Sequence, residues 1–493
     1  MSDYLLGIDI GTSSCKAAVF GADGGIIGSR SREYAVQYPE PGYAQQNPVD
    51  WWEAVCGAVR GIFSDGGVKP SDIKAVGADG QSWSAVVVDK NGRVLFDSPI
   101  WMDTRASAVC EEVGRLIGEK AIFGLCGNPF APTYTTPKLI WFQRNYPYVF
   151  KSAYKVLQSN GYIVYRLTGK YSQDLSQGYG LHFFDMRKGV WDAGMAKEMG
   201  IDCSLMPDIV PCHGIVGNVT EEAAAQTGLL PGTPVVAGGL DAACGTLGVG
   251  AVSDGQTQEQ SGQAGGMSIC LETYKPHEKL ITGFHAVPDR WLLQGGSVGG
   301  GGTLKWLKEN ILTGLGFEDM SALAAHSPVG SGGIVYLPYM AGERSPLWDK
   351  KAKGVYFGLN YAHKRNDLIR STMEGVAYSL YHNIQTAGEA GAYVKNMNAS
   401  GGAANSDVWM QIKADVTGKE IRSARSENAT TLGAAILAGV AVGIYRDFQD
   451  AVNQTVRIKK VYTPNPENHE KYIGSYQVYL QLYENLRMLM HRM

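Results

Sequence analysis

The chain has 493 residues, of which 44% are hydrophobic and 18% charged, and its net charge is −3. This length exceeds what one ordinary core holds, so we expect at least two domains. The small net charge offers no electrostatic footprint for nucleic acid or an anionic membrane. The longest uncharged stretch, residues 432–445, is shorter than the 20 or so apolar residues of a membrane span and predicts a buried helix.

Cysteine and glycine narrow the class of protein further. The eight cysteines are scattered singly, which is typical of reduced thiols in a cytosolic protein. Cys212-His213 has no second pair at ligand spacing, so we expect no structural metal site there. Glycine is abundant, at 63 residues, which indicates many tight turns and backbone lying close to ligands.

The pattern of the N-terminal part predicts strands followed by alternating helix and strand. The strands expected in the first 90 residues cover 4–10, 15–20, 73–79 and 84–89. Residues 23–25 (DGG) form a turn into a further strand, and residues 4–10 include an acid, which is not typical of a signal peptide. Asn47-Pro48 predicts the start of a helix, with Asn as its cap and Pro in its first turn. This order indicates a mixed α/β fold.

A similar order restarts after residue 250. The elements expected there are paired strands at 256–262 and 266–272, a strand at 290–294, and helices that begin near Gly302 or cover 366–388, 405–417 and 468–490. Between the two parts, residues 238–250 carry glycines at close intervals. We place the domain boundary at about residue 247, giving domains 1–247 and 248–493 that enclose a cleft able to open and close.

Two acids follow apolar strands at positions suited to phosphate chemistry. In residues 7–14 (GIDIGTSS), the turn after Asp9 can bring N–H groups and hydroxyls to phosphate oxygens, while the carboxylate can hold hydrated Mg²⁺. The alternative is an ordinary hairpin with a polar turn. In residues 235–245 (VVAGGLDAACG), Asp241 could accept the proton of an attacking alcohol. Its alternative role is that of a helix N-cap.

Two further glycine turns, residues 260–266 (QSGQAGG) and 399–405 (ASGGAAN), could let a nucleotide lie against the backbone. The set of motifs and its order resemble the FGGY carbohydrate kinases of the actin-like ATPase superfamily, nearly from end to end. Residues 354–375 match that family's C-terminal signature, and residues 133–141 (TYTTPKLIW) resemble its first. The segments most similar to xylulokinases are 41–43, 47–48, 51–52, 101–105, 337–339 and 342–344.

The resemblance implies two actin-like (ribonuclease H-like) α/β lobes with ATP and sugar in a central cleft. It places Asp241 on the catalytic base and Asp9 on the magnesium-associated acid. The nucleotide contacts that it implies are Thr12, Ser13, Gly262, Gln263, Gly301, Lys305, Gly401, Gly402 and Ala403. The sugar contacts that it implies are Gln81, Ser82, Trp83, Asp103 and Asp241. It also implies ATP and Mg²⁺ as cofactors, a homodimer and a cytoplasmic location, with neither nucleic acid nor membrane as partner.

Several positions depart from the xylulokinase pattern. On the sugar side these are Ser82, Trp83, Met102 and Ala242, and Gln263 replaces the usual Thr of the second phosphate loop. An unpaired polar group in a buried site costs about 1–3 kcal/mol, so such changes shift specificity. D-xylulose, giving D-xylulose 5-phosphate, is the first candidate; another ketose or polyol of the ribulose, erythritol, glycerol or gluconate class is the alternative. The Trp83 indole could stack on the sugar or belong to the core.

Parts of the sequence also fit other classes of protein. Residues 295–299 (GGSVG) fit the nucleophile elbow of an α/β-hydrolase, with Ser297 as nucleophile and Asp349 and His382 as downstream partners. The FGGY resemblance instead makes this segment backbone beside the nucleotide. An actin-like ATPase without a sugar site is disfavoured by the sugar-side segments, and a sugar sensor without activity is disfavoured by the presence of both Asp9 and Asp241.

Overall fold

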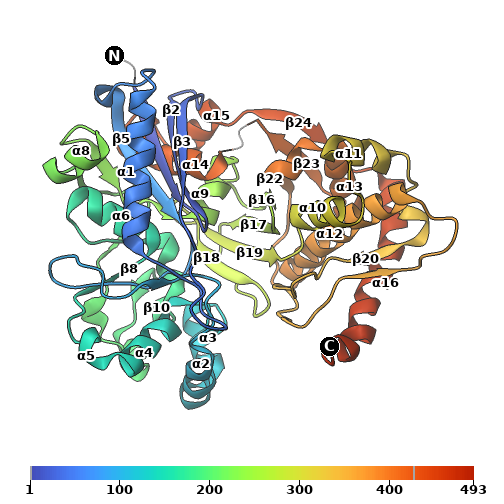
Figure 1. Cartoon of the computed structure of the whole chain (residues 1–493), viewed down its shortest axis with the longest axis horizontal. Coiled ribbons are helices and arrows are strands. Elements are labelled where there is room, and N and C mark those ends of the chain that lie inside the picture. The colour runs from blue at the N-terminus through green and yellow to red at the C-terminus, as the bar shows by residue number, and fades with distance from the viewer. Residues whose placement is uncertain (1–2, 426–427) are drawn as a thin grey trace. The chain divides into compact units, whose positions relative to one another are not determined.

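The computed structural model describes residues 3–425 and 428–493. The chain divides into two compact units, each made of several stretches (Figure 1). Unit 1 comprises Met1–Val252, Thr282–Leu292 and Asn428–Val456, and unit 2 comprises Ser253–Ile281, Leu293–Glu427 and Arg457–Met493. The single division at residue 247 remains a prediction about the domains.

Unit 1 is built on one sheet with the strand order β13-β14-β5-β1-β2-β3, in which β15 also pairs with β5. Its strands are β1 (Tyr4–Ile10), β2 (Ser14–Gly21), β3 (Ile26–Glu33), β5 (Ile73–Gly80), β13 (Ile215–Asn218), β14 (Pro234–Val236) and β15 (Gly239–Leu240). Strand β1 is antiparallel to β2 and parallel to β5, and both β14 and β15 run parallel to β5. The carboxyl ends of β1, β5 and β15 therefore lie at one edge of the sheet.

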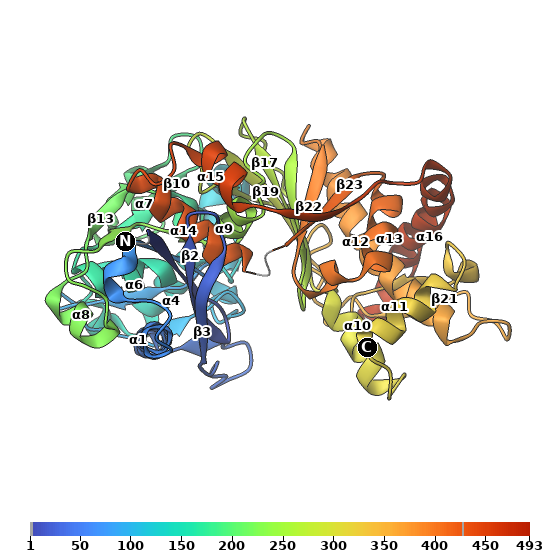
Figure 2. The same ribbon diagram turned by 90° about the horizontal axis from the view of Figure 1, so that it is seen from above.

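Helices cover both faces of this sheet (Figure 2). Helices α1 (Pro48–Ser64) and α6 (Ser159–Thr168) pack on one face, while α9 (Asp241–Gly248) and α14 (Ala429–Ala441) pack on the other. The Asn47 side chain accepts a hydrogen bond of 3.0 Å from the Val49 N–H, which confirms the predicted cap of α1. Helix α14 covers residues 432–441 of the uncharged stretch that was predicted to form a buried helix.

Glycine allows α14 to lie directly on the sheet. A Cβ atom on Gly7 of β1 would stand 2.0 Å from the Thr431 carbonyl oxygen, and one on Gly77 of β5 would stand 2.0 Å from that of Ala434. Any side chain at either position would therefore push the helix away. The close contact brings the first turn of α14, with Thr430, to the carboxyl end of β1.

A second hydrophobic core of unit 1 lies among residues 85–206. Its elements and the other short elements of the unit are β4 (Gln45–Gln46), β6 (Val86–Val88), β7 (Ser98–Pro99), α2 (Ser107–Val113), α3 (Glu119–Cys126), α4 (Thr135–Asn145), α5 (Pro147–Phe150), β8 (Lys155–Leu157), β9 (Gln173–Asp174), β10 (Phe184–Asp185), β11 (Val190–Trp191), α7 (Ala193–Glu198), β12 (Ile209–Val210), α8 (Glu221–Thr227) and α15 (Phe448–Thr455). Strand β6 is shorter than the predicted 84–89, because it pairs only with the three residues of β8.

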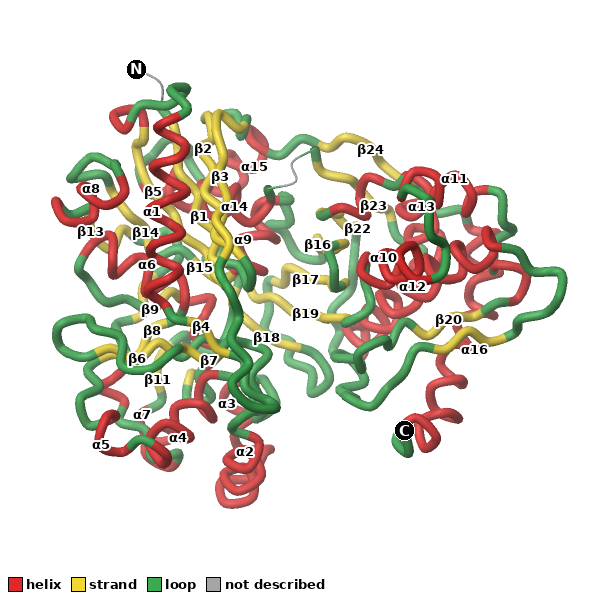
Figure 3. The backbone as a smooth tube through the Cα atoms, viewed as in Figure 1, coloured by secondary structure: helices red, strands yellow, loops and turns green. Residues whose placement is uncertain are grey.

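A second sheet, with the strand order β18-β19-β17-β16-β22-β23-β24, repeats the plan of the first (Figure 3). Its strands, together with the helices and other strands of unit 2, are β16 (Gln256–Ser261), β17 (Gly265–Leu271), β18 (Ile281–Phe284), β19 (Trp291–Ser297), α10 (Gly301–Asn310), α11 (Phe317–Ala325), β20 (Val335–Leu337), β21 (Val355–Phe357), α12 (Arg365–Glu389), β22 (Asn396–Ser400), α13 (Asp407–Thr417), β23 (Glu420–Ala424), β24 (Ile458–Tyr462) and α16 (Pro466–Met490). Residues 282–292, which include most of β18 and the start of β19, are assigned to unit 1. Strand β16 is antiparallel to β17 and parallel to β22, as β1 is to β2 and β5. This duplication confirms the predicted pair of ribonuclease H-like α/β lobes.

Two further observations concern the cysteines and the helices. None of the eight cysteines forms a disulfide. Within residues 3–425 and 428–493, no helix combines the length and the apolar run that crossing a bilayer requires.

Candidate active site

Three carboxyl groups meet at the carboxyl edge of the unit 1 sheet. Asp9 of β1 stands directly beside Asp79 of β5 in the parallel register. Asp79 in turn pairs with Gly239 of β15, and Asp241 begins α9 two residues later. The charges of both Asp9 and Asp241 act on Asp79. The two acids singled out in the sequence therefore converge within one unit, around a third that was not singled out.

Asp9 is held from two sides. The Thr430 hydroxyl of α14 donates a hydrogen bond of 3.0 Å to Asp9 Oδ2, and the Asp79 carboxyl supplies a second hydrogen bond. Burial raises the pKa of Asp9, and these two bonds together with the charge of Lys16 only partly oppose the rise. A cation beside Asp9 would offset the cost of burying its charge.

Asp79 is the last residue of a predicted strand, but it was not among the predicted site residues. Its side chain is 0% exposed, and neither carboxyl oxygen accepts a hydrogen bond from an N–H or hydroxyl group of the described residues. Burial raises the pKa of Asp79 well above its ordinary value, and the charges of Asp9 and Asp241 raise it further. Burial and the two neighbouring charges therefore favour the protonated form of Asp79, which can donate its proton to Asp9. The presence of an acid in a strand of otherwise apolar, buried residues was the sequence signal that could have identified Asp79.

We expect an Asp79→Asn variant to be more stable than the wild type at pH 7. The raised pKa of Asp79 means that above pH 3.8 the folded protein retains a proton that the unfolded chain has lost, so this group's contribution falls as pH rises. The Asn amide is always neutral and still donates to Asp9. Thermal unfolding midpoints measured from pH 4 to pH 8 should show an advantage for the variant that grows with pH. An advantage independent of pH would contradict a protonated Asp79.

Asp241 occupies the first turn of α9 and does not cap it. The N-cap residue is Leu240, so the alternative role predicted for Asp241 is not the one observed. Asp241 Oδ1 accepts a hydrogen bond of 2.6 Å from the Ala242 N–H, and the residue is only partly buried. Just before it, Gly238 has φ +73°, and a Cβ there would stand 1.7 Å from the Ala78 carbonyl oxygen. Glycine thus lets the end of this segment reach β5 and present Asp241 beside the other acids.

The turn after Asp9 is fixed by the segments around it. The Trp101 indole N–H donates 2.9 Å to Thr12 Oγ1, and the Gln46 amide donates 2.8 Å to the Thr12 carbonyl. Ser13 is exposed. The Thr12 hydroxyl is therefore held in place, while Ser13 is accessible.

The predicted sugar-side residues differ in how accessible they are. Gln81 is buried; its amide donates 2.8 Å to Gln46, and its own oxygen has no donor among the described residues. Ser82 is half-buried. Trp83 is 3% exposed and stacks on Tyr134 with ring centroids 4.1 Å apart, as expected of a core aromatic.

Asp103 is also fully buried. Its oxygens accept hydrogen bonds from the Ala44 N–H at 2.7 Å and from the guanidinium of Arg105, with which it forms an ion pair. The carboxylate thus fixes the 101–105 segment, and a contact with sugar remains a prediction.

One buried ammonium joins three sugar-side segments. Lys138 Nζ donates to the carbonyl oxygens of Trp83 at 2.9 Å, Ile100 at 2.8 Å and Thr133 at 2.5 Å. The side chain is fully buried, and burial lowers the pKa of Lys138 to about 7, an effect that the charge of Asp103 partly opposes. Lys138 lies in the 133–141 segment, which resembles a family signature. The sequence did not indicate that this lysine joins three segments.

The second group of predicted residues lines a cavity of about 610 Å³ in unit 2. Its predicted lining residues are Gly262, Gln263, Gly301, Lys305, Gly402 and Ala403. The turn after β16 lies backbone to backbone on the start of α10, because the Gly301 N–H donates 2.8 Å to the Gly262 carbonyl and the Gly302 N–H donates 2.9 Å to that of Gln263. The volume and the apolar wall, which includes Trp409, suit a flat heterocycle.

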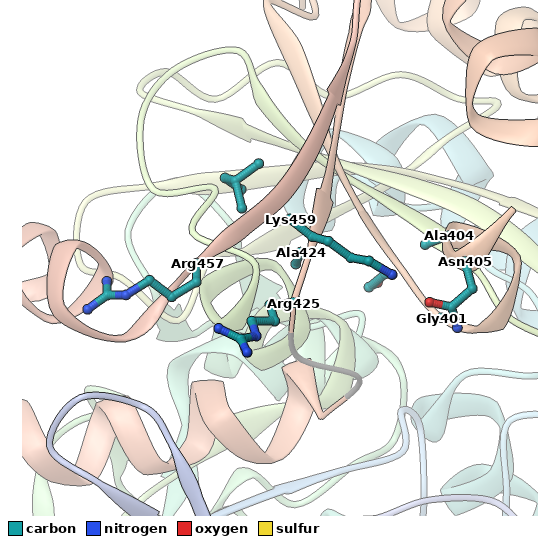
Figure 4. A pocket seen from close by; sticks show the side chains of 9 residues that line it. Gly401, Ala404, Asn405, Ala424, Arg425, Arg457 and Lys459 are labelled. Carbon is teal, nitrogen blue, oxygen red and sulfur yellow. The ribbon is translucent and has the colours of Figure 1, made fainter. Parts of the chain in front are cut away.

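The glycine turn after β22 separates this cavity from a second one. Gly401 has φ +93°, and a Cβ on it would stand 2.8 Å from the backbone of Ser261. It lines a neighbouring cavity of about 750 Å³ whose wall carries the cations Arg425, Arg457 and Lys459 (Figure 4). Figure 4 shows Lys459 extending toward the turn that carries Gly401. The turn is thus flanked by one largely apolar cavity and one basic cavity.

The serine of the hydrolase alternative is not part of a triad. Ser297 is the last residue of β19, and its hydroxyl donates 2.8 Å to buried Glu343. Asp349 binds Tyr483 and His491, while His382 packs against tyrosine rings of α16. Among the described residues, no group of three or more His, Cys, Asp and Glu side chains is placed to hold a metal ion.

Comparison with known proteins matches the chain to one family in two parts. Residues 4–248 match the N-terminal domain of the FGGY family of carbohydrate kinases, and residues 265–442 match its C-terminal domain. A xylulose kinase of Staphylococcus epidermidis (strain ATCC 12228 / FDA PCI 1200) is 30% identical over 491 residues, which cover 99% of this chain and 98% of that protein. A gluconokinase of Bacillus subtilis (strain 168) is 28% identical over 494 residues, which cover 98% of this chain and 96% of that protein.

Solved structures give the same result. The crystal structure of xylulose kinase from Rhodospirillum rubrum superposes with a TM-score of 0.91 at 29% identity, covering 99% of this chain and all of that one. The gluconate kinase structure from Lactobacillus acidophilus also has a TM-score of 0.91, at 24% identity, and supports the fold alone.

Proposed function

Because this chain belongs to the FGGY family of carbohydrate kinases, which makes it an ATP-dependent sugar kinase, we propose that its substrate is a pentulose, D-xylulose first, and that the product is D-xylulose 5-phosphate. The proposed catalytic mechanism rests on one observation, that Asp9, Asp79 and Asp241 lie together at one edge of the sheet. Similarity to xylulose kinases over nearly the whole chain supports the substrate.

In this mechanism Asp241 is the general base. Its carboxylate accepts the proton of the sugar hydroxyl as that oxygen attacks the γ-phosphorus, and ADP leaves from the opposite side. Thr12 and Ser13 receive the phosphate end, and the 610 Å³ cavity receives the adenosine. Because little covalent chemistry is needed, positioning and charge stabilisation supply most of the rate.

Asp9 would hold Mg²⁺. Magnesium keeps several waters and binds proteins through one or two carboxylates together with substrate phosphates, so a single buried acid such as Asp9 fits it. When bound, the cation neutralises charge on the phosphate oxygens.

The proposal also includes a homodimer and a cytoplasmic location. Light scattering on the purified protein would test the first, and cell fractionation would test the second.

A gluconate-class acid is the second candidate, because the Bacillus subtilis gluconokinase matches this chain almost as fully. ADP release measured over ketoses, aldoses, polyols and aldonic acids would distinguish the two. We expect kcat/KM to be highest for D-xylulose, with an Asp241→Ala preparation as the control for contaminating kinases. A preference for gluconate would replace the substrate, and ADP release independent of any sugar would overturn the sugar site.

A further inference from the structure

A buried ion pair lies beneath the turn that follows β16. Lys413 of α13 and Glu259 of β16 form a salt bridge in which both side chains are 2% exposed. Lys413 Nζ also donates to Ser261 Oγ, and that hydroxyl donates to the Glu259 carboxylate at 2.6–2.7 Å. The three side chains, which we name the Lys413 triad, satisfy one another with a consistent set of donors and acceptors.

The Lys413 triad borders the cavity of unit 2 at two places. Ser261 is both a member of the triad and part of the cavity wall, and Gly262 of the turn comes directly after it. The Lys413 ammonium lies 5.2 Å from the ring centroid of Trp409, which also lines the cavity. The ammonium thus ties the turn to helix α13, whose first residues also line the cavity.

The same point supports the turn after β22. Gly401 lies on the Ser261–Gly262 peptide so closely that a Cβ would stand 2.8 Å from Ser261 and 3.1 Å from the Gly262 nitrogen. The Gly262 carbonyl also accepts the Gly301 N–H of α10. A shift of Ser261 would therefore move three of the backbone segments that form the cavity.

Stability alone is a weak reason for such a pair. Removing two charges from water is costly, and replacing a buried pair with apolar residues of similar volume is often neutral or stabilising. We propose that the Lys413 triad is a positioning device that holds the turn at Gly262–Gly266 in the geometry that binds the nucleotide. Lys413 and Glu259 act through Ser261 and are not themselves catalytic. This inference rests on the proposed role of the unit 2 cavity as the nucleotide site.

The test separates positioning from stability with a paired substitution. A Lys413→Met/Glu259→Leu variant removes both charges while filling the space, so its unfolding midpoint should stay close to that of the wild type. Its KM for ATP should rise roughly tenfold or more, since small misplacements near a site have large effects. Its KM for the sugar should change less than threefold. Ser261→Ala, which keeps the ion pair, should raise the KM for ATP in the same direction.

A paired variant that folds and retains the wild-type KM for ATP would overturn the proposal. If the paired variant does not fold, Ser261→Ala decides, and an unchanged KM for ATP in that variant would overturn it equally. Failure of the proposed function looks different, because in that case the wild-type protein would itself show no sugar-dependent ADP release.

Discussion

An Asp241→Ala variant should lose phosphoryl transfer by a factor of about 10² or more, the scale of a missing general base. The carboxylate lies in the first turn of α9, partly accessible, beside Asp79 and Asp9. Methyl in its place leaves no group to accept the proton of the attacking hydroxyl. The expected loss falls on kcat, measured by ADP release at saturating ATP and sugar, while the KM for sugar changes less.

The matched control is Asp65→Ala, which removes an acid on the surface of the same unit that pairs with Arg30. It should retain wild-type turnover. An Asp241→Asn variant keeps the shape and should be as inactive as Asp241→Ala. Near-normal turnover in either Asp241 variant would mean that another group takes the proton.

Features decided by neighbouring residues were predictable from the sequence. The cap at Asn47 needs only its own side chain and the next turn, and β1 follows from alternation within residues 4–10. The glycine turn between β16 and β17 was likewise visible in the spacing of its residues. Propensity and patterning act over such short ranges, which is why the order of elements and the lobe class could be predicted.

Features decided by tertiary contacts were not predictable. Asp79 matters because parallel pairing sets it beside Asp9, and nothing in residues 73–80 indicates that register. Lys413 and Glu259 are separated by 154 positions, so only the fold reveals their ion pair. The same holds for the return of residues 428–456 to unit 1, where Thr430 reaches Asp9.

A Lys138→Met variant should combine a large loss of stability with a weakened sugar site. Its ammonium donates to three carbonyl groups, of which that of Ile100 also accepts the Asp103 N–H at 3.0 Å, and a buried carbonyl left without a donor costs about 1–3 kcal/mol. The carbonyls belong to Trp83, Ile100 and Thr133, so the sugar-side segments lose their common anchor. We expect a lower unfolding midpoint and a raised KM for sugar, with the KM for ATP nearly unchanged. A variant with wild-type stability would contradict this role of the ammonium.

The difference in stability between the wild type and Lys138→Met should also change with pH, in a direction that the pKa of Lys138 predicts. Burial lowers the pKa of Lys138 to about 7 in the folded protein, from 10.5 ordinarily. Between these values the unfolded chain binds a proton that the folded protein does not, so stability from this group rises with pH, by at most about 1.4 kcal/mol per pH unit. Below pH 7 both states are charged and the slope disappears. Because methionine does not titrate, the stability of the wild type relative to Lys138→Met should increase from pH 7 to pH 9, and a constant difference would show that the ammonium stays charged throughout.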